Sequence, residues 1–178
     1  MKKFFLAATG LFAVVPGVGI ILKGLGTPPG YALIFGGIIE ALGALSLILL
    51  YTNRKAIKKL RPARITKTAI WLCIASAVSL LVYIGLFSFC VVGDSIRHYV
   101  YYPLWTTGEV AEMINSAGGR YKALQENGFT AVYRGIREMP YYPLAISITS
   151  GMLLFFYQAI FTSLAVAFGL IGIHKGEE

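Results

Sequence analysis

The chain has few charged residues for its size, and this scarcity excludes most soluble proteins. Charged residues make up 13% of its 178 residues, whereas hydrophobic residues make up 57%. A soluble domain carries roughly 25% charged residues, and disordered chains are poor in apolar residues. Two cysteines are too few for a disulfide scaffold. The composition therefore predicts an integral membrane protein.

Motifs of common catalytic sites are also missing. The sequence has no glycine-rich phosphate loop, nucleophile elbow or His-Glu-x-x-His motif. Cys73 and Cys90 lie about 25 Å apart on one predicted helix and cannot form a disulfide. The two histidines are expected on opposite sides of the membrane, so they cannot share a metal ion. We expect no catalytic residue, cofactor, metal or enzymatic activity. The weakest alternative is a lipid-modifying enzyme that uses His98, Glu109 and Glu112.

Four apolar runs are long enough to cross a bilayer, which takes about 20 residues. They cover residues 4–22, 31–51, 68–92 and 144–173. The first run follows Met1-Lys2-Lys3, as in a signal peptide, but it continues to Leu22, so we interpret it as an uncleaved span. Cleavage after about Gly19 is the alternative. The sequence predicts an all-α integral membrane protein: one domain over residues 1–178, with a four-helix bundle and a small helical extracytoplasmic segment between helices 3 and 4.

Basic residues set the expected orientation. The loop over residues 52–67 has seven basic residues and no acidic residue. The positive-inside rule places this loop, and with four spans both termini, in the cytoplasm. The Met-Lys-Lys start and the cysteine-poor outer segment suggest a bacterial inner membrane. Six of the loop's cations are candidate contacts for anionic lipid or a partner: Arg54, Lys55, Lys58, Lys59, Arg61 and Arg64. Apart from this basic loop, nothing in the sequence indicates nucleic-acid binding, and no nucleic-acid partner is expected.

The outer segment, residues 94–142, is rich in aromatic residues. Thr106 with Glu109 predicts a capping box that starts a helix, and Gly118-Gly119 would end it. Two more helices are expected over residues 120–127 and 130–138. A Tyr-Tyr-Pro-Leu motif occurs at each end of the segment and predicts an interfacial aromatic belt or a docking surface. The residues of this surface are Tyr101, Tyr102, Trp105, Tyr141 and Tyr142.

One acidic residue, Glu40, lies near the middle of the second predicted span, where a carboxylate costs a few kcal/mol. Ala32, Gly36 and Gly43 share its helical face, so another helix can approach closely there. We expect Glu40 to lie at a helix contact. Its candidate partners at similar depth are Ser79, Tyr83 and Gln158. Three roles are open: a protonated or hydrogen-bonded Glu40 that fixes packing, a contact with another subunit, or a proton or cation path.

Two functions follow as hypotheses. The first is a small non-catalytic membrane subunit or scaffold that packs against other membrane chains. The second is a homo-oligomeric ion channel, or a pore that depolarises the membrane, lined by Glu40. The expected partners are the lipid bilayer and either other membrane subunits or copies of this chain. The layout resembles tetraspanin-like proteins in outline, but no cysteine falls between Asp94 and Tyr142 to crosslink the outer segment.

Overall fold

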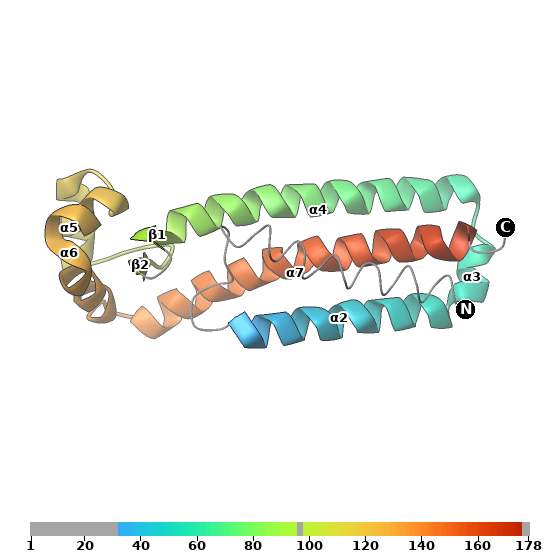
Figure 1. The fold of residues 1–178 in the computed structure, drawn as a ribbon, viewed down its shortest axis with the longest axis horizontal. Coiled ribbons are helices and arrows are strands. Elements are labelled where there is room, and N and C mark those ends of the chain that lie inside the picture. Colours follow the sequence, from blue (N-terminus) through green and yellow to red (C-terminus); the bar gives the residue numbers. More distant parts are fainter. Residues whose placement is uncertain (1–31, 96–97, 176–178) are drawn as a thin grey trace. The chain divides into compact units, whose positions relative to one another are not determined.

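The computed structural model describes residues 32–95 and 98–175, with side chains for residues 41–93 and 99–174. In these ranges the chain is mainly helical, and a short two-stranded hairpin is its remaining regular element (Figure 1). The predicted first span, residues 4–22, lies outside the described residues. The backbone of Ala32, Gly36 and Glu40 belongs to a described helix, but their side chains lie outside the described set.

Among the described residues, two helices are long and apolar enough to cross a membrane: α4 (Pro62–Cys90) and α7 (Tyr142–Lys175). Helix α2 (Ala32–Thr52) has 21 residues, and its portion Ala41–Thr52 is a shorter apolar helix. The predicted third span is extended at its start, because Pro62 lacks an N–H and suits the first turn of a helix. The short helix α3 (Arg54–Lys58) joins α2 to α4. The expected basic loop is therefore largely helical.

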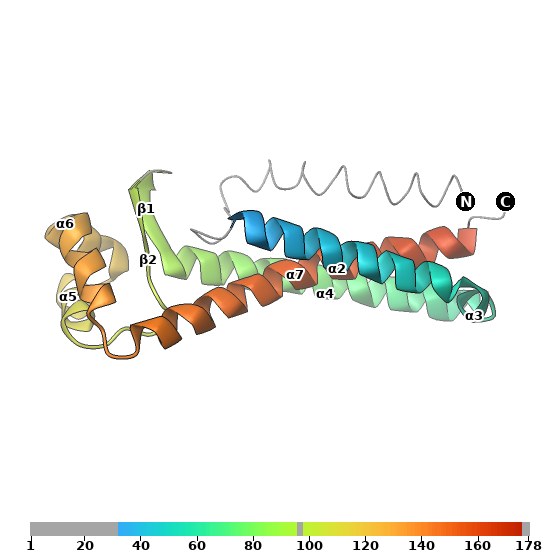
Figure 2. The same cartoon turned by 90° about the horizontal axis from the view of Figure 1, so that it is seen from below.

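The chain divides into two compact units. The described part of the first unit comprises residues 32–83 and 154–175, and the second unit comprises residues 84–153 apart from 96–97. Within the first unit, α2 and its portions of α4 and α7 run side by side in both views (Figures 1 and 2). One of its apolar clusters joins α3, α4 and α7 and contains Ile57, Ile65, Leu170 and Ile173.

The contact of α2 with α7 is close at Gly169. A Cβ atom at this position would lie 2.7 Å from Leu50 Cδ1 and 3.2 Å from Leu47 Cδ2. Small residues allow such an approach between membrane helices. The two helices run in the same direction along this contact (Figure 1).

The second unit has its own core. Strands β1 (Val91–Ser95) and β2 (His98–Tyr101) form an antiparallel hairpin in which Val92 pairs with Val100. Helices α5 (Glu109–Ala117) and α6 (Arg120–Arg137) pack against it. The buried cluster contains Val92, Val100, Tyr102, Val110, Val132, Ile136 and Met139. The third span was predicted as helical to residue 92, and this end was wrong because the β-branched Val91 and Val92 pair as a strand.

Glycines delimit the helices of the second unit. Gly118 ends α5 in the left-handed conformation with φ of 75°, and Gly128 breaks α6 with φ of 77°. Both breaks confirm the sequence prediction. The predicted capping box was wrong, because Gly108 is the N-cap of α5 and no side chain caps it. The Thr107 N–H instead donates to Met139 Sδ at 3.4 Å, which draws this turn toward the core.

Candidate functional site

Several of the polar residues that the sequence predicts within the membrane lie at the contact of α4 and α7 in the first unit. The Tyr83 side chain is fully buried, and its ring centroid lies 5.2 Å from that of Tyr157. Ser76 Oγ, which is also buried, donates to the Ile160 carbonyl at 3.0 Å. Ser79, predicted as part of this cluster, is half-buried. Hydroxyl-to-carbonyl bonds of this kind join membrane helices where water is absent.

Gln158 in α7 has one buried atom that lacks a partner. Its Nε2 donates to Thr162 Oγ1 at 2.7 Å, whereas its Oε1 has no hydrogen-bond partner among the described residues. An unmatched buried acceptor costs about 1–3 kcal/mol. A donor from a neighbouring helix would remove this cost.

The depth of Glu40 matches that of Gln158. Gln158 precedes Gly169 by 11 residues, which is about 16 Å along α7. Glu40 precedes Leu47 and Leu50, which contact Gly169, by seven and ten residues, or about 10–15 Å along α2. The two helices run in the same direction, so both positions lie within about one helical turn in depth. Gly43, from the predicted packing face, is buried.

The predicted basic site lies on α3 and the start of α4. Arg54 is half-buried, its guanidinium carbon lies 4.1 Å from the centroid of the Tyr51 ring, and it donates weakly to the Tyr51 carbonyl at 3.5 Å. The other five cations of the predicted site are exposed. The arginine is attracted to the face of the tyrosine ring, and tyrosine is a residue that is enriched at membrane–water boundaries.

The predicted aromatic surface separates into core and surface residues. Tyr102 is fully buried. Tyr101 is half-buried, and its hydroxyl lies 3.1 Å from Ser150 Oγ. Tyr142 packs against the core cluster. Trp105 and Tyr141 are exposed, Tyr141 by 78%. Tyr102 therefore acts as a core residue of the second unit and not as a docking residue.

Arg120, which sequence reasoning missed, joins three segments of the second unit: the end of α4, residues 102–104 and the start of α6. It donates to the carbonyls of Phe89, Pro103 and Leu104 at 2.9, 3.0 and 3.1 Å. Its guanidinium carbon lies 3.8 Å from the Phe89 ring centroid and 5.2 Å from that of Tyr102. The Tyr102 hydroxyl donates in return to the Arg120 carbonyl at 3.2 Å. These residues, Phe89, Tyr102, Pro103, Leu104 and Arg120, form the Arg120 cluster.

Burial changes the acid–base properties of this cluster. Burial raises the pKa of Tyr102 to about 12, and the charge of Arg120 opposes that rise. Burial lowers the pKa of Arg120, with Cys90 and Tyr102 opposing it. Both groups keep their protons at neutral pH, so the cluster is a fixed cation among carbonyls and rings. It has no free base or nucleophile, and its chemistry is that of a structural contact.

A second feature that the sequence did not single out is a stripe on α6. Phe129 and Tyr133 are 44% and 43% exposed, and their rings stack with centroids 5.8 Å apart and an interplanar angle of 8°. The Arg137 guanidinium carbon lies 5.7 Å from the Tyr133 centroid. The three residues follow at intervals of four, so they share one helical face. We call Phe129, Tyr133 and Arg137 the α6 stripe.

Within the described residues, no group of three His, Cys, Asp or Glu side chains is placed to bind a metal ion. Glu109 and Glu112 are exposed in the first turn of α5. Comparison with family models, curated proteins and solved structures gave no match for this chain.

Proposed function

We propose that this chain is a non-catalytic, multi-pass subunit of the plasma membrane that binds the outer portion of another membrane protein through the α6 stripe. The observation that carries the proposal is the stripe itself: two stacked aromatic rings and an arginine, exposed on a helix whose opposite face is anchored in a core. Tyr, Trp and Arg dominate the binding energy of protein interfaces. Rings that are already ordered lose little entropy on binding.

The charges beside the stripe favour a protein partner over anionic lipid. Arg134 and Glu138 form an exposed ion pair at 4.0 Å on the same half of α6. Anionic headgroups attract clusters of Lys and Arg without acidic residues. A surface with both charge signs around aromatic rings instead resembles the polar rim and aromatic centre of a protein interface.

The membrane arrangement in this proposal has four spans, with both termini and the basic residues of α3 in the cytoplasm and the second unit outside. The exposed cations between Arg54 and Arg64 support it, as does the stacking of Arg54 on Tyr51. A membrane-impermeant maleimide applied to intact cells should label Thr130→Cys but not Leu60→Cys. Labelling of Leu60→Cys but not of Thr130→Cys would show that the topology is the reverse of the one proposed.

Site-specific photocrosslinking in native membranes tests the proposal. A photoreactive residue at Tyr133 should give one adduct of defined mass, and Phe129→Ala should reduce its yield several-fold. The matched control is the same group at Tyr121, which is 49% exposed on the first half of α6 and should give no such adduct. Equal adducts at both positions, or adducts with lipid only, would contradict the proposal.

A further inference from the structure

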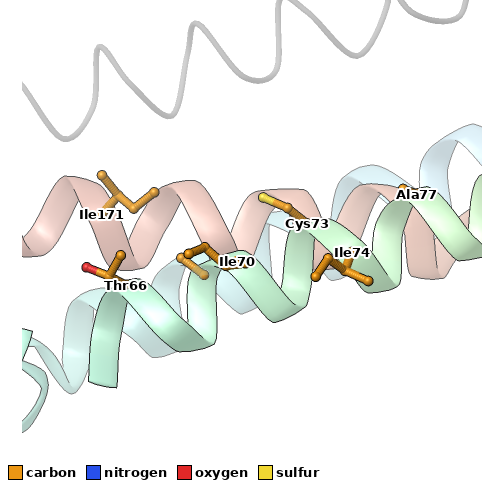
Figure 3. A pocket seen from close by; sticks show the side chains of 7 residues that line it. Thr66, Ile70, Cys73, Ile74, Ala77 and Ile171 are labelled. Carbon is orange, nitrogen blue, oxygen red and sulfur yellow. The ribbon is translucent and has the colours of Figure 1, made fainter. Parts of the chain in front are cut away.

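An apolar groove runs along one face of the first unit, whereas the α6 stripe belongs to the second. The groove has a volume of about 360 Å³ and an almost wholly apolar lining. Figure 3 labels six of its lining residues, five from α4 and one from α7: Thr66, Ile70, Cys73, Ile74, Ala77 and Ile171. Ile70 and Ile74 are 54% and 45% exposed, so no described segment covers the groove.

The length of the groove matches the depth of one leaflet of a bilayer. Its lining on α4 runs from Thr66 to Ala77 (Figure 3), which is about 16 Å along the helix. The hydrocarbon core of a bilayer is about 30 Å thick, so one leaflet contributes about 15 Å. A transmembrane helix would need a groove along the whole span, whereas an acyl chain reaches only the bilayer centre. The length therefore favours an acyl chain as the occupant.

Small residues give the groove its depth. Ala69, which also lines it and is 3% exposed, is followed by Cys73 and Ala77 at intervals of four residues. The larger Ile70 and Ile74 stand beside this row on the same helix. A cysteine thiol behaves as a small apolar group, so the row offers dispersion contacts to a hydrocarbon chain and little to a polar ligand.

One end of the groove is polar and positively charged. Thr66, the lining residue with a hydroxyl, is followed directly by the exposed Lys67, which lies one turn before Ile70. Arg64, also exposed, lies one turn before Lys67. Side chains on a helix lean toward its N-terminus, and long cationic side chains keep their stems on apolar surface and their charges in the headgroup region. Both cations are therefore placed to reach the headgroup of a lipid whose chain lies in the groove.

No acidic residue near this end opposes an anionic headgroup. Residues 41–83 and 154–174 contain no Asp or Glu. On α7, the exposed His174 lies three residues after Ile171, and its ring can donate a further hydrogen bond. Clusters of Lys and Arg without acidic residues attract anionic lipids, so the charge of this end complements a phosphate group.

We propose that the groove binds an acyl chain of one anionic phospholipid from the surrounding bilayer, whose phosphate is held by Arg64 and Lys67. The inference rests on the proposed membrane arrangement only in that α4 crosses the bilayer. It goes beyond a general attraction of the basic residues for anionic lipid, because the chain-binding groove and the cations together select one lipid molecule. The α6 stripe and its partner take no part in it.

Native mass spectrometry of retained lipid tests this site. The full chain is reconstituted in vesicles with equal amounts of phosphatidylcholine and phosphatidylglycerol, extracted gently, and weighed with the phospholipid that stays bound. We expect one phosphatidylglycerol per chain, in several-fold excess over phosphatidylcholine. The double variant Arg64→Gln/Lys67→Gln should lose this preference. Lys122→Gln, at an exposed cation of the second unit, is the matched control and should keep it.

A second pair of variants tests the groove itself. Ala77→Phe places a ring in the groove and should reduce the retained phospholipid several-fold. Ala75→Phe makes the same change two residues away, on the other side of α4, and should retain as much phospholipid as the unchanged protein. Both positions are exposed, so both variants should fold.

Three results would overturn the inference. Equal retention of the two phospholipids by the unchanged protein would remove the preference for an anionic headgroup. Equal retention by Ala77→Phe and Ala75→Phe would place the bound lipid outside the groove. A dimer without bound phospholipid, dissociated by Ala77→Phe alone, would assign the groove to a second copy. A failure of the photocrosslink at Tyr133 would change none of these results, so the two proposals fail separately.

Discussion

The guanidinium of Arg120 donates to the Phe89 carbonyl at 2.9 Å, one of the last carbonyls of α4. The final carbonyls of a helix have no partner within it, and the helix dipole makes them negative. The Tyr102 N–H donates to the next carbonyl, that of Cys90, at 2.7 Å. Arg120 and Tyr102 thus cap the C-terminal end of α4, which lies within the second unit.

Arg120→Ala should destabilise the second unit by about 2–3 kcal/mol, because it leaves three carbonyls without a charged donor. Trp105 fluorescence during denaturant unfolding, in a Trp71→Phe background, reports on this unit alone. Arg134→Ala is the matched control, because that side chain is 67% exposed. Its removal should change the free energy of unfolding by less than about 0.5 kcal/mol. Equal effects of the two substitutions would show that Arg120 does not cap α4.

Alkaline pH should weaken the second unit through Tyr102. This tyrosine has a pKa of about 12 when folded, against 10.0 for the free side chain. Between these two pH values the unfolded state binds fewer protons than the folded state. The contribution of protonated Tyr102 to the free energy of unfolding is therefore fully present below pH 10 and is lost as the pH rises toward 12. At pH 11 the loss should be about 1.4 kcal/mol relative to pH 9. Denaturant unfolding of Tyr102→Phe should lack this step, and an identical loss in the variant would refute the assignment.

Gly169→Leu should separate α2 from α7. A Cβ atom added there would lie 2.7 Å from Leu50 Cδ1, and overpacking costs about 1–3 kcal/mol. Gly172→Leu is the matched control, since its Cβ would meet no atom within 4 Å, and it should be neutral or slightly stabilising. Thermal unfolding in detergent measures both variants. Similar melting temperatures for the two would contradict the described contact.

Local chemistry explains what the sequence predicted well. The left-handed turn at Gly118 and the break at Gly128 both confirm their predictions, because positive φ favours glycine. The two long apolar helices follow from length and composition. Such features depend on residues a few positions apart, which a single sequence displays.

Long-range contacts explain what it missed. Arg120 contacts the Phe89 carbonyl 31 residues away, and no periodicity signals that pair. The same cluster buries Tyr102, which an aromatic motif placed at the surface. The hairpin formed because Val91 and Val92 found partners in Tyr101 and Val100. The α6 stripe is visible in the sequence, since its members recur every four residues, but that spacing alone does not show which face of the helix is exposed.

Native mass spectrometry of the assembly extracted gently from its own membranes tests the central claim most directly. The account predicts this chain together with a different membrane protein at fixed stoichiometry, and loss of that protein in the Phe129→Ala/Tyr133→Ala variant. A lone monomer, or a closed ring of this chain alone, would contradict it.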